Sequence, residues 1–229
     1  LERETRTLAE GSLQSVLERS DMRQDPPCSQ APRCGGCQLQ HVTPQDQLTL
    51  KKQWLIQTLR RVGRWDQGQI DLAVRLIRCQ QASPSGYRVR ARWHFDSETL
   101  GFFARRSHQV VSSQDCLLMV PPVVEAHSKL LARLKADELS RLYQRAGLVD
   151  LQIEATLLRS NAVVLSLCAL ACRKQKEEPA LRGKLQLLVK EWNDTWVDSD
   201  GFADVAHPER DPFWVGAQVF VQPHSEALS

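Results

Sequence analysis

The most regular pattern in the chain is an alternation of apolar and polar residues between positions 87 and 95. Apolar side chains occupy the odd positions, namely Tyr87, Val89, Ala91, Trp93 and Phe95. The even positions carry Arg88, Arg90, Arg92 and His94. Because successive side chains of a strand point to opposite faces of a sheet, this pattern predicts a strand with one apolar face and one basic face.

Shorter runs of the same period surround that strand. Separated by turn residues, they predict antiparallel strands throughout residues 70–111, with residues 101–104 and 109–111 continuing the sheet. Residues 151–158 alternate and predict another strand. The nearly continuous apolar run at residues 162–170 favours a buried strand, and residues 214–222 predict a last one.

Three other segments have the apolar spacing of helices. Thr43, Pro44 and Asp46 supply a cap, a first-turn proline and a carboxylate, which predicts a helix over residues 44–62 that ends at Gly63. Further helices are predicted over residues 121–146, with Gly147 as the stop, and over residues 179–192. The interleaved strands and helices predict an α+β fold, in which a cysteine-rich loop precedes a mainly antiparallel sheet with packed helices.

Composition restricts the class of protein only broadly. The chain has 229 residues, 42% apolar and 25% charged, which is typical of a globular protein. The net charge of +3 is too small to indicate nucleic-acid binding by itself. No apolar run approaches the roughly 18 residues that span a bilayer, and Leu1 begins neither a signal peptide nor a usual reading frame. We therefore expect a cytoplasmic protein without membrane contact, and we expect the sequence to be part of a longer reading frame.

The cysteines are the first candidates for chemistry. Three of the seven form a C-x5-C-x2-C pattern in a loop rich in glycine and proline, and a fourth stands alone far downstream: Cys28, Cys34, Cys37 and Cys116. Three ligands from one loop plus a distant fourth is a common arrangement around an iron–sulfur cluster. Structural zinc is the competing interpretation, although zinc sites usually pair C-x2-C at both ends. Unliganded thiols are a third.

The remaining cysteines are Cys79, Cys168 and Cys172. Cys168 and Cys172 lie in or just after an apolar run, and free cysteine is among the most buried residue types. We therefore predict a structural role for all three.

Several motifs resemble those of one enzyme family. They are Cys34-Gly35-Gly36-Cys37-Gln38-Leu39-Gln40-His41, Gly86-Tyr87-Arg88-Val89-Arg90-Ala91-Arg92, Gly101-Phe102, Cys116 and Phe220-Val221-Gln222. Together they resemble the RNA uracil-5-methyltransferases, which use S-adenosylmethionine (SAM) to make 5-methyluridine in tRNA and rRNA. The resemblance implies that Cys28, Cys34, Cys37 and Cys116 bind a 4Fe-4S cluster. It also implies RNA as the partner and Gln222 as a residue of the SAM-binding domain.

The resemblance divides the chain into four parts. Residues 1–27 resemble the linker that leaves a TRAM domain, residues 28–43 the iron–sulfur cluster loop, residues 44–213 a central α+β RNA-binding domain, and residues 214–229 the start of a truncated methyltransferase domain. Pro223-His224 depart from the asparagine that usually follows F-x-Q. The family's attacking cysteine, its base and its glycine-rich SAM loop have no counterpart, so no catalytic residue is assigned. We expect this polypeptide alone not to methylate RNA.

The basic face of the strand is the predicted RNA site. Arg88, Arg90 and Arg92 would stand about 7 Å apart, close to the spacing of successive phosphates. Arginine also supplies planar forks that bind phosphate and stack on bases. The row would be extended by His94, Arg105 and Arg106. The alternative is a solvated sheet face, and the choice of RNA over DNA rests on the resemblance.

Two other functions stay open at this point. One is a stand-alone iron–sulfur protein that binds RNA or acts as a scaffold, and the other is a zinc-stabilised interaction module. Electron transfer has less support, because no flavin or partner motif is visible. We expect a monomer.

Overall fold

The structure is a computed structural model that describes residues 3–4, 9–11, 13–77, 83–158, 160–194, 202–204 and 214–216. Its helices are α1 (Pro44–Arg61), α2 (Gln67–Leu76), α3 (Pro121–Leu134), α4 (Asp137–Ala146) and α5 (Glu178–Asp194), with a short 3-10 helix at Gln175–Glu177. Its strands are β1 (Arg3–Glu4), β2 (Ala9–Glu10), β3 (Arg90–Phe95), β4 (Leu100–Phe103), β5 (Val110–Ser112), β6 (Leu148–Leu157), β7 (Val163–Cys172), β8 (Phe202–Asp204) and β9 (Trp214–Gly216).

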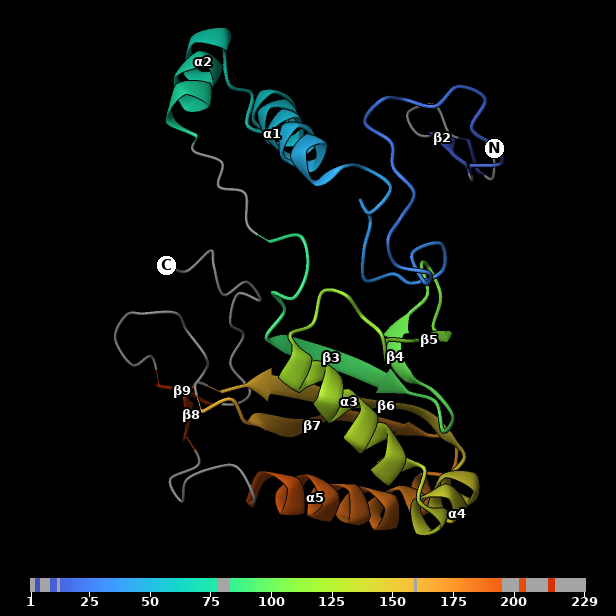
Figure 1. Cartoon of the computed structure of the whole chain (residues 1–229). Helices are drawn as coiled ribbons and strands as arrows, with labels where there is room; N and C mark the ends of the chain where they lie inside the picture. The colour runs from blue at the N-terminus through green and yellow to red at the C-terminus, as the bar shows by residue number, and fades with distance from the viewer. Residues whose placement is uncertain are drawn as a thin grey trace.

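A five-stranded antiparallel sheet forms the centre of the molecule, in the order β5-β4-β3-β6-β7 (Figure 1). Strand β3 lies in the middle, and its pairing with β6 places Trp93 opposite Ile153 and Arg92 opposite Glu154. Two short hairpins, β1–β2 and β8–β9, form separate sheets. The predicted α+β fold with a mainly antiparallel sheet is confirmed.

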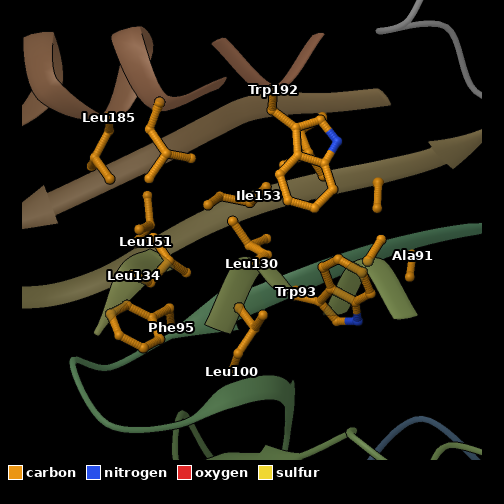
Figure 2. Close-up of a cluster of buried hydrophobic side chains, with 14 of the residues drawn as sticks. Ala91, Trp93, Phe95, Leu100, Leu130, Leu134, Leu151, Ile153, Leu185 and Trp192 are labelled. Carbon is orange, nitrogen blue, oxygen red and sulfur yellow. The ribbon is translucent and has the colours of Figure 1, made fainter. Parts of the chain in front are cut away.

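The apolar face of the sheet packs against α3, α4 and α5. Trp93 and Phe95 are fully buried there, as the alternation at residues 87–95 predicts. Figure 2 shows them with Leu130 of α3, Leu185 of α5 and Ile153 of β6 in one cluster. Burying a side chain of this size contributes roughly 1.5–3 kcal/mol, so this layer holds the sheet together.

Helices α1 and α2 pack on each other and project from the sheet region (Figure 1). α1 begins as predicted, because the Thr43 side chain accepts a hydrogen bond from the Asp46 N–H at 3.2 Å. The strands predicted over residues 70–111 are present as β3, β4 and β5, but the prediction is wrong for residues 70–76, which belong to α2. Asp66 and Gln69 form a reciprocal capping box that starts the helix instead.

The single helix predicted over residues 121–146 is also wrong. The backbone leaves the helical conformation at Lys135 and Ala136, and Asp137 starts α4. Leu134 and Leu139, one on each side of the break, are both buried. Residues five positions apart on one straight helix point about 140° away from each other, so the turn lets both leucines face the same core.

The strand predicted over residues 162–170 is present as β7, but its expected burial holds only in part. Leu165 is buried, whereas Cys168 is exposed. β7 is an edge strand of the sheet, and α5 packs against it. The prediction of a buried structural Cys168 is therefore wrong, while Cys172 is half-buried and packs against the core.

Some sequence-based expectations lie outside the described residues. These are Cys79, Gln222 and the predicted strand beyond Gly216, of which β9 covers the beginning. Within the described ranges, no helix is both long enough and apolar enough to cross a membrane.

Candidate cysteine site and basic face

The loop that carries three cysteines is attached to the end of β4 by backbone hydrogen bonds. The Gly35 N–H donates to the Phe103 carbonyl at 2.9 Å, and the Arg105 N–H donates to the Arg33 carbonyl at 3.1 Å. A β-bridge joins Cys34 to Ala104. The loop thus pairs with the end of β4 through its backbone, which fixes the cysteines relative to β4.

The glycines of the loop have a steric purpose. A Cβ atom at Gly35 would lie 2.7 Å from the Phe103 carbonyl oxygen, so a side chain there would push the loop off the strand. The next N–H, of Gly36, donates to the Cys34 sulfur at 3.3 Å. The backbone therefore supplies one hydrogen bond to the Cys34 sulfur.

Cys116 reaches the same place through a second set of backbone contacts. The segment just after it runs beside the segment just before β3, since Tyr87 and Arg88 both donate to the Leu118 carbonyl, at 3.0 and 2.7 Å. The Cys116 N–H closes a turn onto the Ser113 carbonyl at 3.2 Å. This turn follows β5 directly, and β5 pairs with β4, which bears the cysteine loop.

All four predicted cysteine ligands line one cavity of about 250 Å³. Its walls include Cys28, Cys34, Cys37, Cys116, Arg88 and Phe102. Burial raises the pKa of the Cys37 thiol, and the neighbouring Cys116 and Cys34 add to this, while Gln40 and Arg88 act in the opposite direction. Bringing several thiolates together is costly unless a cation or a metal group compensates their charge.

Within the part of the chain that the structure describes, no three His, Cys, Asp or Glu side chains lie close enough together to bind a single metal ion. A zinc ion needs four ligands at about 2.0–2.3 Å from one point. The cysteines surround a space without meeting at one point.

Arg88 is at this cavity rather than on an open basic surface. Its guanidinium lies over the Phe102 ring, with the Cζ atom 5.5 Å from the ring centroid. Its Nε is buried and has no hydrogen-bond partner among the described residues. Burial and the nearby Cys37 and Cys116 raise the pKa of Tyr87, whereas Arg88 lowers it.

The rest of the arginine row is largely neutralised by β6. Arg90 is buried and forms an ion pair with the buried Glu154, whose other oxygen accepts from Arg92 at 3.0 Å. The side chain of Arg92 is 55% exposed, against 8% for Arg90. The three arginines of the predicted basic face therefore differ in their surroundings, because a carboxylate on the neighbouring strand binds two of them.

The remaining residues of the predicted basic face have separate surroundings. His94 stacks on Phe103 with ring centroids 3.6 Å apart, and its Nδ1 lies 3.1 Å from both oxygens of Asp150. Arg105 donates to the Cys37 carbonyl at 2.7 Å. Arg106 is exposed in the β4–β5 turn with a left-handed φ of 53°.

The pattern at residues 87–95 did not reveal Glu154 and Asp150. Both lie on the polar side of the alternating segment at residues 151–158 or just before it, so period two was a usable signal. The sequence pattern could not identify which residue of another strand each side chain pairs with, because that depends on the order and register of the strands.

No protein-family model matches the chain. Its curated relatives include proteins named as RNA methyltransferases. An uncharacterised RNA methyltransferase of Bdellovibrio bacteriovorus is 33% identical over 138 residues, which cover 58% of this chain and 33% of the relative.

Two relatives carry a more specific name, 23S rRNA (uracil(1939)-C(5))-methyltransferase. The protein of Pseudomonas syringae is 32% identical over 157 residues, which are 68% of this chain and 34% of the relative. The protein of Neisseria lactamica is 29% identical over 211 residues, which are 87% of this chain and 42% of the relative. The chain thus spans about a third of the length of the first relatives that it matches.

Proposed function

We propose that the chain is the cluster-bearing and RNA-binding part of an RNA uracil-5-methyltransferase that acts on rRNA or tRNA. Residues 28–43 would be the cluster loop, residues 44–213 the RNA-binding domain, residues 1–27 a linker, and residues 214–229 the start of the methyltransferase domain. The proposal for the reaction is supported by the two 23S rRNA uracil-C5 methyltransferases among the relatives. These relatives favour a methyltransferase over a stand-alone interaction module.

The observation that carries the cluster proposal is the common cavity of Cys28, Cys34, Cys37 and Cys116. When bound, a 4Fe-4S cluster would tie the loop to the turn after β5 through four thiolate bonds. An inorganic core of several atoms needs ligand sulfurs farther apart than a single zinc ion does. Zinc sites usually pair C-x2-C at both ends, and the second pair is absent here, which favours the cluster over zinc.

RNA would bind the polar face of the sheet through a reduced set of the predicted residues. Arg92 is the exposed arginine of the row, and Arg106 stands on the turn beyond β4. His94, whose ring stacks on Phe103, would be a further contact on the same strand as Arg92. The buried Arg90 would hold Glu154 and thereby the position of Arg92, so its role would be support rather than phosphate binding.

The activity proposed for the whole protein is methyl transfer from SAM to C5 of a uridine. This chain's own residues would position the RNA and bind the cluster. Gln222, which lies outside the described residues, would contact SAM.

The cluster proposal is tested by purifying the chain without oxygen and measuring iron, sulfide, zinc and visible absorbance. We expect about four irons and four sulfides per chain, as one such cluster requires. Cys116→Ser should lose most of them. The matched control is Cys168→Ser, because Cys168 is exposed and does not line the cavity. Stoichiometric zinc in a colourless protein would overturn the cluster in favour of a zinc site.

The RNA proposal is tested by titrating a single-stranded uridine-containing RNA at several salt concentrations. Arg92→Gln together with Arg106→Gln should weaken binding and reduce the salt slope by roughly 0.7 for each phosphate that the variant no longer binds. The control is Arg145→Gln, since Arg145 is also exposed but lies on α4 and pairs with Glu177. An unchanged slope in the double variant would move the RNA site off this face.

A further inference from the structure

Arg88 is held rigidly at the entrance of β3. Its N–H donates to the Leu118 carbonyl at 2.7 Å, and its own carbonyl accepts from the Val120 N–H at 3.2 Å. A parallel β-bridge with Met119 fixes the same position. The backbone thus ties Arg88 to the segment that follows Cys116, so the side chain starts next to one predicted cluster ligand.

The side chain contributes to the cavity wall. Its guanidinium covers the Phe102 ring, and Arg88, Phe102, Cys37 and Cys116 all line the same space. The positive charge is therefore directed to the cysteines rather than to an outer surface of the sheet.

The Nε–H group of Arg88 lacks a hydrogen-bond acceptor among the described residues. It is buried, and no acceptor lies within hydrogen-bond distance in the described part of the chain. Leaving a buried donor without an acceptor is unfavourable, and more so when the donor is charged. Arg90 and Arg92, on the same strand, both have carboxylate partners. An acceptor that belongs in the cavity would satisfy Arg88 in the same way.

We propose that Arg88 is a positioning residue of the cluster, whose Nε–H donates to a cluster sulfur and whose charge offsets the negative charge of the four thiolates and the core. This rests on the cluster proposed above, and it replaces the RNA contact that the sequence pattern suggests for Arg88. Hydrogen bonds to sulfur and nearby charge are two of the factors that set the stability and reduction potential of such clusters.

The test compares Arg88→Gln with Arg92→Gln in the anaerobically purified chain with its cluster. Loss of an outer partner of a metal site typically costs about 10–100-fold in affinity. We expect Arg88→Gln to shorten the lifetime of the visible absorbance in air by about tenfold or more, by the same principle, and to make the midpoint potential more negative. Arg92→Gln should match the wild-type protein in both, because Arg92 does not line the cavity.

Arg88→Lys separates the donor from the charge. It keeps a cation on a long stem but lacks the Nε–H, so we expect a cluster lifetime between those of Arg88→Gln and the wild-type protein. Circular dichroism of the cluster-free proteins identifies any variant that fails to fold. If Arg88→Gln fails to fold, the comparison of Arg88→Lys with the wild-type protein tests the role of the Nε donor.

Wild-type lifetime and potential in Arg88→Gln, or a wild-type lifetime in Arg88→Lys, would overturn the role of the Nε donor while leaving the cluster proposal standing. A wild-type chain that binds neither iron nor sulfide would overturn both.

Discussion

The guanidinium of Arg105 donates a hydrogen bond to the carbonyl oxygen of Cys37 at 2.7 Å, across a sequence separation of 68 residues. Arg105 follows β4, and Cys37 is the last cysteine of the loop. The side chain therefore adds a third hydrogen bond between the cysteine loop and the end of β4, beside the backbone bonds of Gly35 and Arg105. It connects the sheet to the candidate cluster site.

Replacing Arg105 by Gln should loosen the cysteine loop. The charged hydrogen bond that this change removes contributes about 1–2 kcal/mol after discounting for its exposure, which corresponds to roughly 5–30-fold faster local opening. Hydrogen exchange of the amides at residues 34–38 measures this opening. Arg106→Gln is the control, because Arg106 is the next residue and is exposed in the β4–β5 turn. Equal exchange in the two variants would mean that the Arg105 bond does not restrain the loop.

Glu154→Gln should strongly destabilise the fold. The change leaves Arg90 as a buried charge without its carboxylate, and breaking a buried pair in this way costs about 3–5 kcal/mol. Urea unfolding measures the loss. Glu177→Gln, which breaks the more exposed pair with Arg145, should cost no more than about 1 kcal/mol. A small effect of Glu154→Gln would show that solvent compensates the charge of Arg90.

Gly101 and Gly183 should respond to alanine in opposite directions. A Cβ atom at Gly101 would lie 1.9 Å from the Val111 carbonyl oxygen, so Gly101→Ala must separate β4 from β5 and should cost about 1–3 kcal/mol or more. Gly183 lies inside α5, and a Cβ atom there would meet no other atom within 4 Å. Gly183→Ala should therefore raise the free energy of unfolding by about 0.5–1 kcal/mol. Thermal unfolding of the two variants checks both signs.

His127 should make the protein sensitive to mild acid. It is fully buried, its Nε2 donates to the Leu100 carbonyl at 3.0 Å, and burial lowers its pKa, although Asp115 and the Leu100 carbonyl act in the opposite direction. As the pH falls below the unfolded-state pKa of about 6.5, His127 takes up a proton in the unfolded chain but stays neutral in the native state. The free energy of unfolding therefore falls with pH, by up to about 1.4 kcal/mol per unit from this group.

The variant that tests this is His127→Gln, which keeps a donor for Leu100 and removes the titration. Its stability should vary less between pH 6.5 and 5, measured by urea unfolding at each pH, than that of the wild-type protein. Parallel pH profiles would assign the acid sensitivity to other groups.

Local patterns determined the elements whose ends and faces are set by neighbours in sequence. Thr43, Pro44 and Asp46 predict the start of α1 because capping involves residues three positions apart. The alternation through Trp93 and Phe95 predicts the core face of β3, because strand geometry alone assigns side chains to faces. The turn at Lys135 and the exposure of Cys168 were not predicted, since each depends on which elements pack around that position.

The cysteine positions also came from sequence, but their common cavity required the pairing of β4 with β5 and the contact of Leu118 with Arg88. The roles of the arginines were decided by tertiary structure. Arg88, Arg90 and Arg92 are equivalent in the sequence pattern, yet one lines the cavity, one is buried against Glu154 and one is half exposed. Period two assigns a side chain to a face, whereas its charge partner comes from a strand some 60 residues away, brought there by the strand order and register that the whole core selects.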